Sequence, residues 1–139
     1  MSCWCHVAGV MRIDAIRVDE TEIDWDELIG KECLWGSGND TWYDMELNPD
    51  KYLPMGSEGS LRKNVWVNPD LSRCTAYTVT IWGDLRDCDI DDAKKIAEWF
   101  ENKCKQFSIR QAMITIDAEF QGTKTYIYND DKEELICIQ

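Results

Sequence analysis

Residues 55–63 read Met-Gly-Ser-Glu-Gly-Ser-Leu-Arg-Lys and contain the residue types best suited to hold an anion. The two glycines and two serines allow neighbouring backbone N–H groups to point the same way, which creates a nest for a phosphate or carboxylate. Arg62 and Lys63 follow directly and add two cations. Aromatic side chains nearby in the sequence are able to stack on a base. The predicted binding residues are Gly56, Ser57, Glu58, Gly59, Ser60, Arg62, Lys63, Trp42, Tyr52 and Trp66.

This segment predicts a pocket for a nucleotide or a phosphate group, and a second interpretation stands beside it. Gly/Ser segments are also common in ordinary surface loops, so a flexible loop without a ligand explains the same residues. Pockets for small nucleotides often form between protomers, so the first interpretation also predicts a homo-oligomer.

Cys3, Cys5 and His6 suggest a metal site, but their spacing argues against one. On a strand, Cys3 and Cys5 share a face while His6 points to the opposite face, so the three cannot converge on one ion. The sequence also has no second pair of cysteines to complete the four ligands of a structural zinc site. We predict no metal and no cofactor.

The acidic residues Asp87, Asp89 and Asp91 have the spacing of the first ligands of a calcium-binding loop. However, Asp92 occupies the position that requires glycine, and a helix has already begun there. We therefore interpret Asp89 as the cap of a helix.

The sequence also lacks the residues that nucleophilic catalysis needs. His6 is its one histidine, and a nucleophile requires a base beside it. There is neither a Gly-x-Ser-x-Gly sequence nor a phosphate-binding Walker loop. We expect no catalytic residues and no enzymatic activity.

The composition is strongly acidic. The 139 residues include 27 Asp and Glu against 15 Lys and Arg, which gives a net charge of −12. Direct binding to nucleic acid is therefore not expected, because contacts to phosphates require Lys and Arg. Residues 19–27, 84–92 and 130–134 are acidic clusters that could form one negative face and compete for a basic nucleic-acid channel. The alternative is ordinary solvated surface.

The cysteines and the hydropathy indicate the compartment. Seven cysteines at irregular spacing do not suggest a disulfide framework, so we expect reduced thiols, several of them in the core. The N-terminus has neither the basic nor the apolar region of a signal peptide. No apolar run is long enough to span a membrane. We expect a cytosolic protein that does not contact a membrane.

The periodicity predicts the elements that must position these residues. Strands are expected at residues 3–13, 61–67, 75–82, 111–119 and 123–128, and an edge strand or tail at 135–138. Helices are expected at residues 23–33 and 89–107, and the strands 61–67 and 75–82 form a hairpin around a turn at 68–72. Residues 35–60 have no periodicity and form a long irregular insert rich in aromatics and glycine.

This order predicts an α+β fold in a single domain, residues 1–139. The expected arrangement is a ferredoxin-like split βαβ, with an antiparallel sheet, two helices on one face, the irregular insert and a C-terminal strand extension.

Residues 52–61, YLPMGSEGSL, and 83–87, GDLRD, resemble a group of small phage and prophage proteins of Gram-positive gut bacteria. Shorter segments also match: Trp4-x-His6-Val7, Arg12-Ile13-Asp14, Asn68-Pro69, Ala76-Tyr77-Thr78-Val79 and Arg110-Gln111-Ala112. The resemblance covers most of the chain and implies a viral origin, and it carries over no catalytic residue. Cys3 and Cys5 depart from the group's pattern. By type, a small acidic protein without catalytic residues is similar to counter-defence inhibitors.

We therefore expect a non-enzymatic viral counter-defence protein that acts by binding and sequesters a small nucleotide immune signal. One alternative is an acidic inhibitor that mimics nucleic acid and blocks a host defence nuclease, as anti-CRISPR proteins do. Another is a structural or assembly protein of the phage particle, whose exposed aromatics form an interface. The expected partner is accordingly a small nucleotide or a host defence protein.

Overall fold

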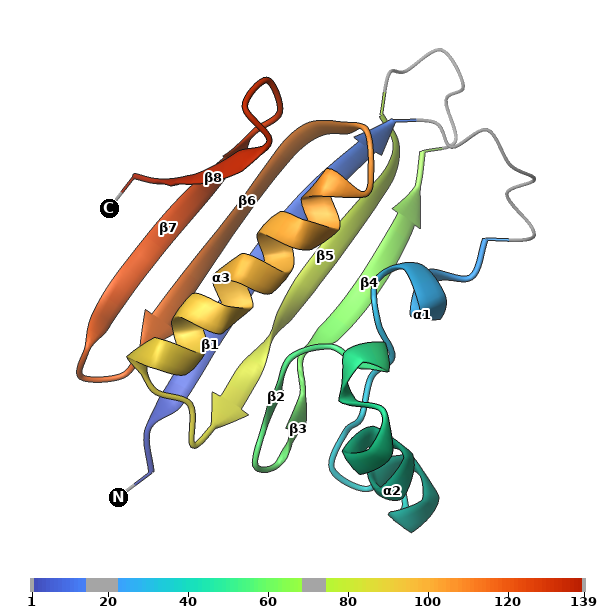
Figure 1. Ribbon diagram of the computed structural model, residues 1–139, viewed down its shortest axis with the longest axis vertical. Helices are drawn as coiled ribbons and strands as arrows, with labels where there is room; N and C mark the ends of the chain where they lie inside the picture. The colour runs from blue at the N-terminus through green and yellow to red at the C-terminus, as the bar shows by residue number, and fades with distance from the viewer. Residues whose placement is uncertain (1, 15–22, 69–74, 139) are drawn as a thin grey trace.

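The computed structural model describes residues 2–14, 23–68 and 75–138. These residues form an α+β fold with a six-stranded antiparallel sheet and three helices (Figure 1). In chain order the elements are β1 (Trp4–Asp14), α1 (Trp25–Leu28), α2 (Asn39–Leu47), a 3-10 turn (Pro49–Lys51), β2 (Met55–Gly56), β3 (Gly59–Ser60), β4 (Arg62–Val67), β5 (Thr75–Arg86), α3 (Ile90–Lys105), β6 (Ile109–Ala118), β7 (Gly122–Asn129) and β8 (Glu134–Cys137).

The strands of the main sheet follow the order β4-β5-β1-β6-β7-β8, and β2 and β3 pair separately. The prediction of a central strand at the N-terminus is confirmed, because β1 pairs with β5 on one side and β6 on the other. The predicted hairpin is also confirmed as β4 and β5. Residues 69–72 of the expected turn lie outside the described residues.

One face of the sheet is buried against α3, which lies across it in Figure 1. Strand β1 sends Cys5, Val7, Met11 and Ile13 into this core, as its alternating pattern predicted. The helix contributes a buried stripe that consists of Ile96, Ala97, Phe100 and Cys104. Burial of this stripe, rather than helix propensity, holds the helix in place.

The predicted cap of α3 is confirmed. The Asp89 side chain accepts a hydrogen bond from the Asp92 backbone N–H at 2.9 Å, and the Asp92 side chain accepts one from the Asp89 N–H at 3.1 Å. This reciprocal pair satisfies two N–H groups that have no partner within the helix.

The opposite face of the sheet carries exposed and half-buried side chains, and we call it the open face. It consists of Trp4, His6, Ala8, Val10 and Arg12 of β1, together with the side chains of their cross-strand partners on the same side. Within the described residues, none of the three helices covers this face in Figure 1.

The prediction of a helix over residues 23–33 is wrong in its extent. Residues 23–33 form only the single turn α1, which Asp24 caps as expected. Gly30 has a φ of 140° and ends the helical path. The N–H of Lys31 then donates to the Lys51 carbonyl, so the chain turns toward the insert. Trp25 nevertheless packs edge-on against Tyr77 at 5.2 Å and so covers part of the same core.

The insert at residues 35–60 is not irregular, contrary to the prediction. It contains α2, the 3-10 turn and the hairpin β2–β3. Helix α2 has no buried residue, so it lacks the apolar stripe by which sequence patterns identify helices.

No helix in the described residues is long and apolar enough to cross a membrane.

The expectation that the thiols are reduced is wrong for one pair. Cys5 of β1 and Cys88 after β5 form a disulfide, and both are buried. The bond ties the segment that precedes α3 to the central strand. Of the free cysteines, Cys33 and Cys104 are buried as expected, Cys3 is half-buried and Cys137 is exposed, while Cys74 lies outside the described residues. Burial raises the pKa of the Cys104 thiol to about 12, so this thiol stays protonated at neutral pH.

Candidate functional site

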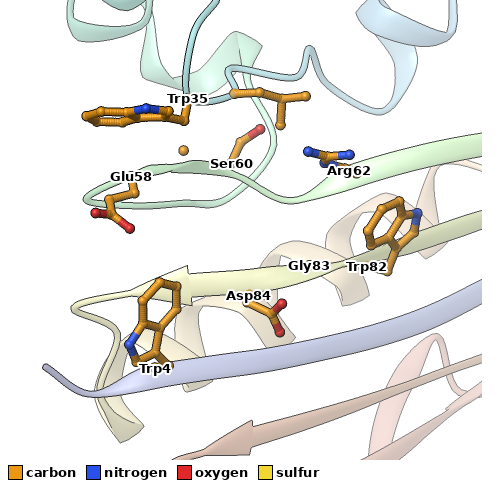
Figure 2. A pocket seen from close by; sticks show the side chains of 10 residues that line it. Trp4, Trp35, Glu58, Ser60, Arg62, Trp82, Gly83 and Asp84 are labelled. Carbon is orange, nitrogen blue, oxygen red and sulfur yellow. The ribbon is translucent and has the colours of Figure 1, made fainter.

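A cavity of about 560 Å³ lies where the hairpin β2–β3 meets the open face (Figure 2). We call it the tryptophan cavity. Its lining residues are Trp4, Leu34, Trp35, Glu58, Gly59, Ser60, Arg62, Trp82, Gly83 and Asp84. In Figure 2, Trp4 and Trp35 lie on opposite sides with Glu58 between them, and Arg62 and Trp82 lie together at one end.

The hairpin β2–β3 supplies Glu58 and Gly59 and is fixed to the end of β5. At Gly56 the backbone passes so close to β5 that an added Cβ would lie 2.5 Å from the Arg86 carbonyl oxygen. The Ser57 N–H donates to that same carbonyl at 3.0 Å. Arg86 then donates to the Glu58 carboxylate at 2.6 Å. The glycine therefore permits a close approach that holds the hairpin in place.

The turn that carries Trp35 is held on β3 by backbone contacts. The Cys33 N–H donates to the Ser60 hydroxyl and the Ser60 N–H to the Cys33 carbonyl, each at 2.8 Å. Gly59 has a φ of 136° and pairs with Leu34 as an isolated bridge. These contacts leave the Trp35 side chain 78% exposed above the cavity.

Arg62 and Trp82 form the end of the cavity because they are direct cross-strand partners on β4 and β5. The Arg62 guanidinium carbon lies 5.2 Å from the centre of the Trp82 ring. This distance is that of a cation–π contact, which orders a long side chain that would otherwise move freely. Both residues are exposed and available to a ligand.

His6 connects three segments beside the cavity. In its charged form the ring donates from Nδ1 to Asp84 at 2.6 Å and from Nε2 to Glu119 at 3.0 Å. The other oxygen of Glu119 accepts the Trp4 backbone N–H at 3.1 Å. The hydrogen bond to Asp84, followed by that to Glu119, raises the pKa of His6 above its usual value of 6.5. The charged ring therefore holds two cavity residues, Asp84 directly and Trp4 through Glu119.

Four of the ten predicted binding residues line the tryptophan cavity: Glu58, Gly59, Ser60 and Arg62. Gly56 and Ser57 support the hairpin instead, and the Ser57 N–H is bonded to a carbonyl rather than directed at an anion. Lys63 points to the other side of β4, where its side chain is only 8% exposed and pairs with Asp26. Trp42, Tyr52 and Trp66 do not line the cavity, and Tyr52 donates to Asp44.

Sequence reasoning missed the other lining residues: Trp4, Leu34, Trp35, Trp82, Gly83 and Asp84. Trp82 could have been inferred from the sequence. The predicted hairpin pairs residues 61–67 with 75–82, so it brings the strand of Trp82 next to the strand of Arg62, where cross-strand side chains contact each other. No local pattern indicates that Trp35 lies above β3, since the contact depends on residues that are 27 positions apart, Cys33 and Ser60.

No protein-family profile, curated protein or solved structure matches the chain.

The chemistry of the cavity is suited to recognition. Its aromatic rings offer flat apolar surfaces, Arg62 offers a planar set of N–H donors, and Glu58 and Asp84 offer acceptors. Among the described residues, no group of three or more His, Cys, Asp or Glu side chains is arranged to hold a metal ion. The arrangement favours a ligand with a flat ring, hydroxyl or amino groups and an anionic part.

Proposed function

We propose that this protein binds a small nucleotide in the tryptophan cavity and acts by sequestering it, without catalysis. The observation that carries the proposal is the presence of three tryptophans and an ordered arginine around one cavity of about 560 Å³. Ligand cavities of roughly 300–1,000 Å³ hold molecules of nucleotide size.

Each part of a nucleotide has a counterpart in this cavity. The base stacks on Trp35 or Trp4, because every base has an aromatic face that tolerates such a platform. The phosphate accepts hydrogen bonds from the Arg62 guanidinium, whose planar donors match phosphate oxygens. The carboxylates of Glu58 and Asp84 accept from ribose hydroxyls or from a base amino group.

The charges around the cavity are mixed, which favours this function over nucleic-acid mimicry at this site. Arg62, Arg86 and charged His6 lie among Glu58, Asp84 and Glu119. A mimic of nucleic acid requires a continuous negative surface. The net charge of −12 still favours an acidic inhibitor of a defence nuclease as a second candidate, with the contact on another face of the molecule. Binding of that kind would weaken steeply as salt is added.

We also propose a viral counter-defence role in the cytoplasm of the bacterial host, based on the resemblance of residues 52–61 to phage proteins. We further propose a ferredoxin-like topology for the four strands β4, β5, β1 and β6. Strands β4 and β1 both run antiparallel to β5, which lies between them, and β5 and β6 both run antiparallel to β1. This strand order supports the proposal of two split βαβ units. In this comparison the turn α1 takes the place of the first helix.

Isothermal titration calorimetry with a panel of cyclic and ADP-ribose-type nucleotides tests the proposed function. We expect at least one of them to bind and to quench tryptophan fluorescence. Trp35→Ala should weaken that binding by about tenfold or more, because base stacking contributes roughly 1–3 kcal/mol. Arg62→Ala should weaken it similarly, because a charge-assisted bond to phosphate is lost.

Two variants provide matched controls. Tyr43→Ala removes an exposed aromatic from α2, and Lys95→Ala removes an exposed cation from α3, and neither residue lines the cavity. Both should bind the nucleotide as the wild type does. The proposal fails if no nucleotide of the panel binds, or if Trp35→Ala and Arg62→Ala bind as tightly as the two controls.

A further inference from the structure

The open face carries an apolar row across the middle of the sheet. Pairing aligns Val10 of β1 with Met113 of β6, Ile127 of β7 and Ile136 of β8. Met113, Ile127 and Ile136 are all exposed, although their side chains are apolar. The exposed Ala8 lies beside this row on β1. Soluble proteins rarely expose contiguous apolar surface of this kind without a partner.

The face is large enough for a stable interface. Neighbouring strands lie about 4.8 Å apart and rise about 3.3 Å per residue, so six strands of roughly eight residues cover about 650 Å². This value is the area of the backbone sheet and does not include the additional surface of the side chains. Each partner in a standard interface contributes about 800 Å². The sheet face therefore approaches the required area by itself.

The surroundings of His6 and Arg12, toward the two ends of the open face, differ in charge: carboxylates flank His6, whereas the uncharged Thr78 and Gln111 flank Arg12. Farther from β1, Arg62 and Arg86 also lie toward the His6 end, and Glu134 lies toward the Arg12 end. At one end, Asp84 and Asp117 flank His6 on the neighbouring strands, and Glu119 follows directly after β6. Charged His6 neutralises only part of the negative charge of these three carboxylates. The exposed Arg12 lies at the other end of β1. Arg12 is six positions after His6, which is about 20 Å along the strand.

We propose that a second copy of this chain covers the open face, with a two-fold axis perpendicular to the strands. This axis sets Arg12 of each copy over the acidic end of the other and brings the apolar rows together in the middle. An axis parallel to the strands would instead set acid over acid, which like charges disfavour. The match between Arg12 and the carboxylates around His6, together with the area, thus favours a second copy in this orientation as the occupant.

The orientation also brings Trp66 toward the tryptophan cavity of the other copy. The axis preserves the order of strands, so the β4 edge of one copy lies over the β4 edge of the other. Trp66 lies at the Arg12 end of β4, while Ser60, just before β4, lines the cavity at the opposite end. In the dimer each Trp66 therefore lies over the cavity of its neighbour.

Sedimentation equilibrium of the full chain tests the interface. We expect the wild type to form dimers between micromolar and near-millimolar concentration. Met113→Asp should weaken dimerisation by more than about tenfold, because it places a carboxylate in the apolar centre. Leu47→Asp is the matched control, since Leu47 is an exposed apolar residue of α2 outside this face. It should dimerise like the wild type.

A charge exchange tests the orientation. Arg12→Asp alone and Asp117→Arg alone should each weaken the dimer, and the double variant should restore it because the ion pair is rebuilt with its signs reversed. The two residues are too far apart within one copy to compensate each other. Circular dichroism establishes that each variant is folded.

A wild type that sediments as a monomer throughout the range would overturn the proposal. So would a folded Met113→Asp variant that dimerises like Leu47→Asp, and a double exchange that fails to restore association would overturn the orientation.

Discussion

Protonation of His6 should stabilise the fold at acidic pH and not at alkaline pH. The charged ring makes two hydrogen bonds to carboxylates, at 2.6 Å to Asp84 and 3.0 Å to Glu119. Its side chain is 43% exposed, so solvent screens both contacts. Partly exposed pairs contribute roughly 0.2–1 kcal/mol each, and together they should contribute about 1 kcal/mol to the free energy of unfolding.

The sign follows from the raised pKa of His6. A group with a higher pKa in the folded state binds its proton more tightly there, so the proton stabilises the fold. This contribution is complete below the unfolded value of 6.5 and is lost as the pH rises through the folded value. Above that value the neutral ring has one N–H, so one of the two carboxylates loses its donor.

Urea unfolding of the wild type and His6→Gln at about pH 5.5 and about pH 9 measures this effect on either side of the titration. We expect the variant to be about 1 kcal/mol less stable at the lower pH and the difference to shrink toward zero at the higher pH. Arg12→Gln is the control on the same strand face, because its guanidinium stays charged at both values. It should show no comparable change between them.

Nuclear magnetic resonance gives an independent measurement, because the chain contains one histidine and so one set of imidazole signals. The measured pKa of His6 should lie above 6.5 and fall in Asp84→Asn, which loses the charged hydrogen-bond acceptor that raises this pKa most. A pKa at or below 6.5 in the wild type would refute the reasoning, as would an equal loss of stability in His6→Gln at both pH values.

Two further predictions concern the framework of the site. Replacing both Cys5 and Cys88 with alanine should lower the free energy of unfolding by about 2–5 kcal/mol, because the disulfide closes a long loop. Peptide mapping of the wild type without reductant should recover the two cysteines as a linked pair. Two free thiols at these positions would contradict the prediction. Gly56→Ala should displace the hairpin, because its Cβ would lie 2.5 Å from the Arg86 carbonyl oxygen. It should weaken nucleotide binding more than Gly122→Ala, which strains the backbone at a φ of 112° but lies outside the cavity. Calorimetry compares the two variants, and equal affinities would show that the hairpin is not held by this contact.

The elements with a strong periodic pattern were predictable from the sequence. Strand β1 alternates between the buried Cys5, Val7, Met11 and Ile13 and the side chains of the open face, and this period of two is explicit in the sequence. Helix α3 has both an apolar stripe and a cap at Asp89, so two independent signals agree. In each case the burial that stabilises the element also requires apolar residues at regular spacing, and this spacing is the pattern that the sequence shows.

The insert and the disulfide were not predictable because their signals are not local. Helix α2 buries no residue and so has no stripe to detect. The pairing of Cys5 with Cys88 joins residues 83 positions apart, and sequence alone cannot assign such connectivity. The cavity combines both difficulties, because Trp35 reaches it through a turn fixed by Cys33 and Ser60. The Gly/Ser segment was correctly suspected, but its glycines permit backbone packing and its neighbour Lys63 faces away from the cavity.

The two proposals meet at Trp66, and their combination has a thermodynamic consequence. If a second copy brings Trp66 over the mouth of the tryptophan cavity, the closed cavity encloses a base more completely than the cavity of a single copy. Ligand binding and self-association are then coupled. Thermodynamic linkage requires that each strengthens the other by the same factor. Nucleotide should therefore shift the dimer equilibrium toward the dimer, and dilution of the protein should weaken nucleotide binding. Affinities measured above and below the dissociation constant of the dimer would be equal for a cavity that is complete in one copy, and would differ for a cavity that two copies share.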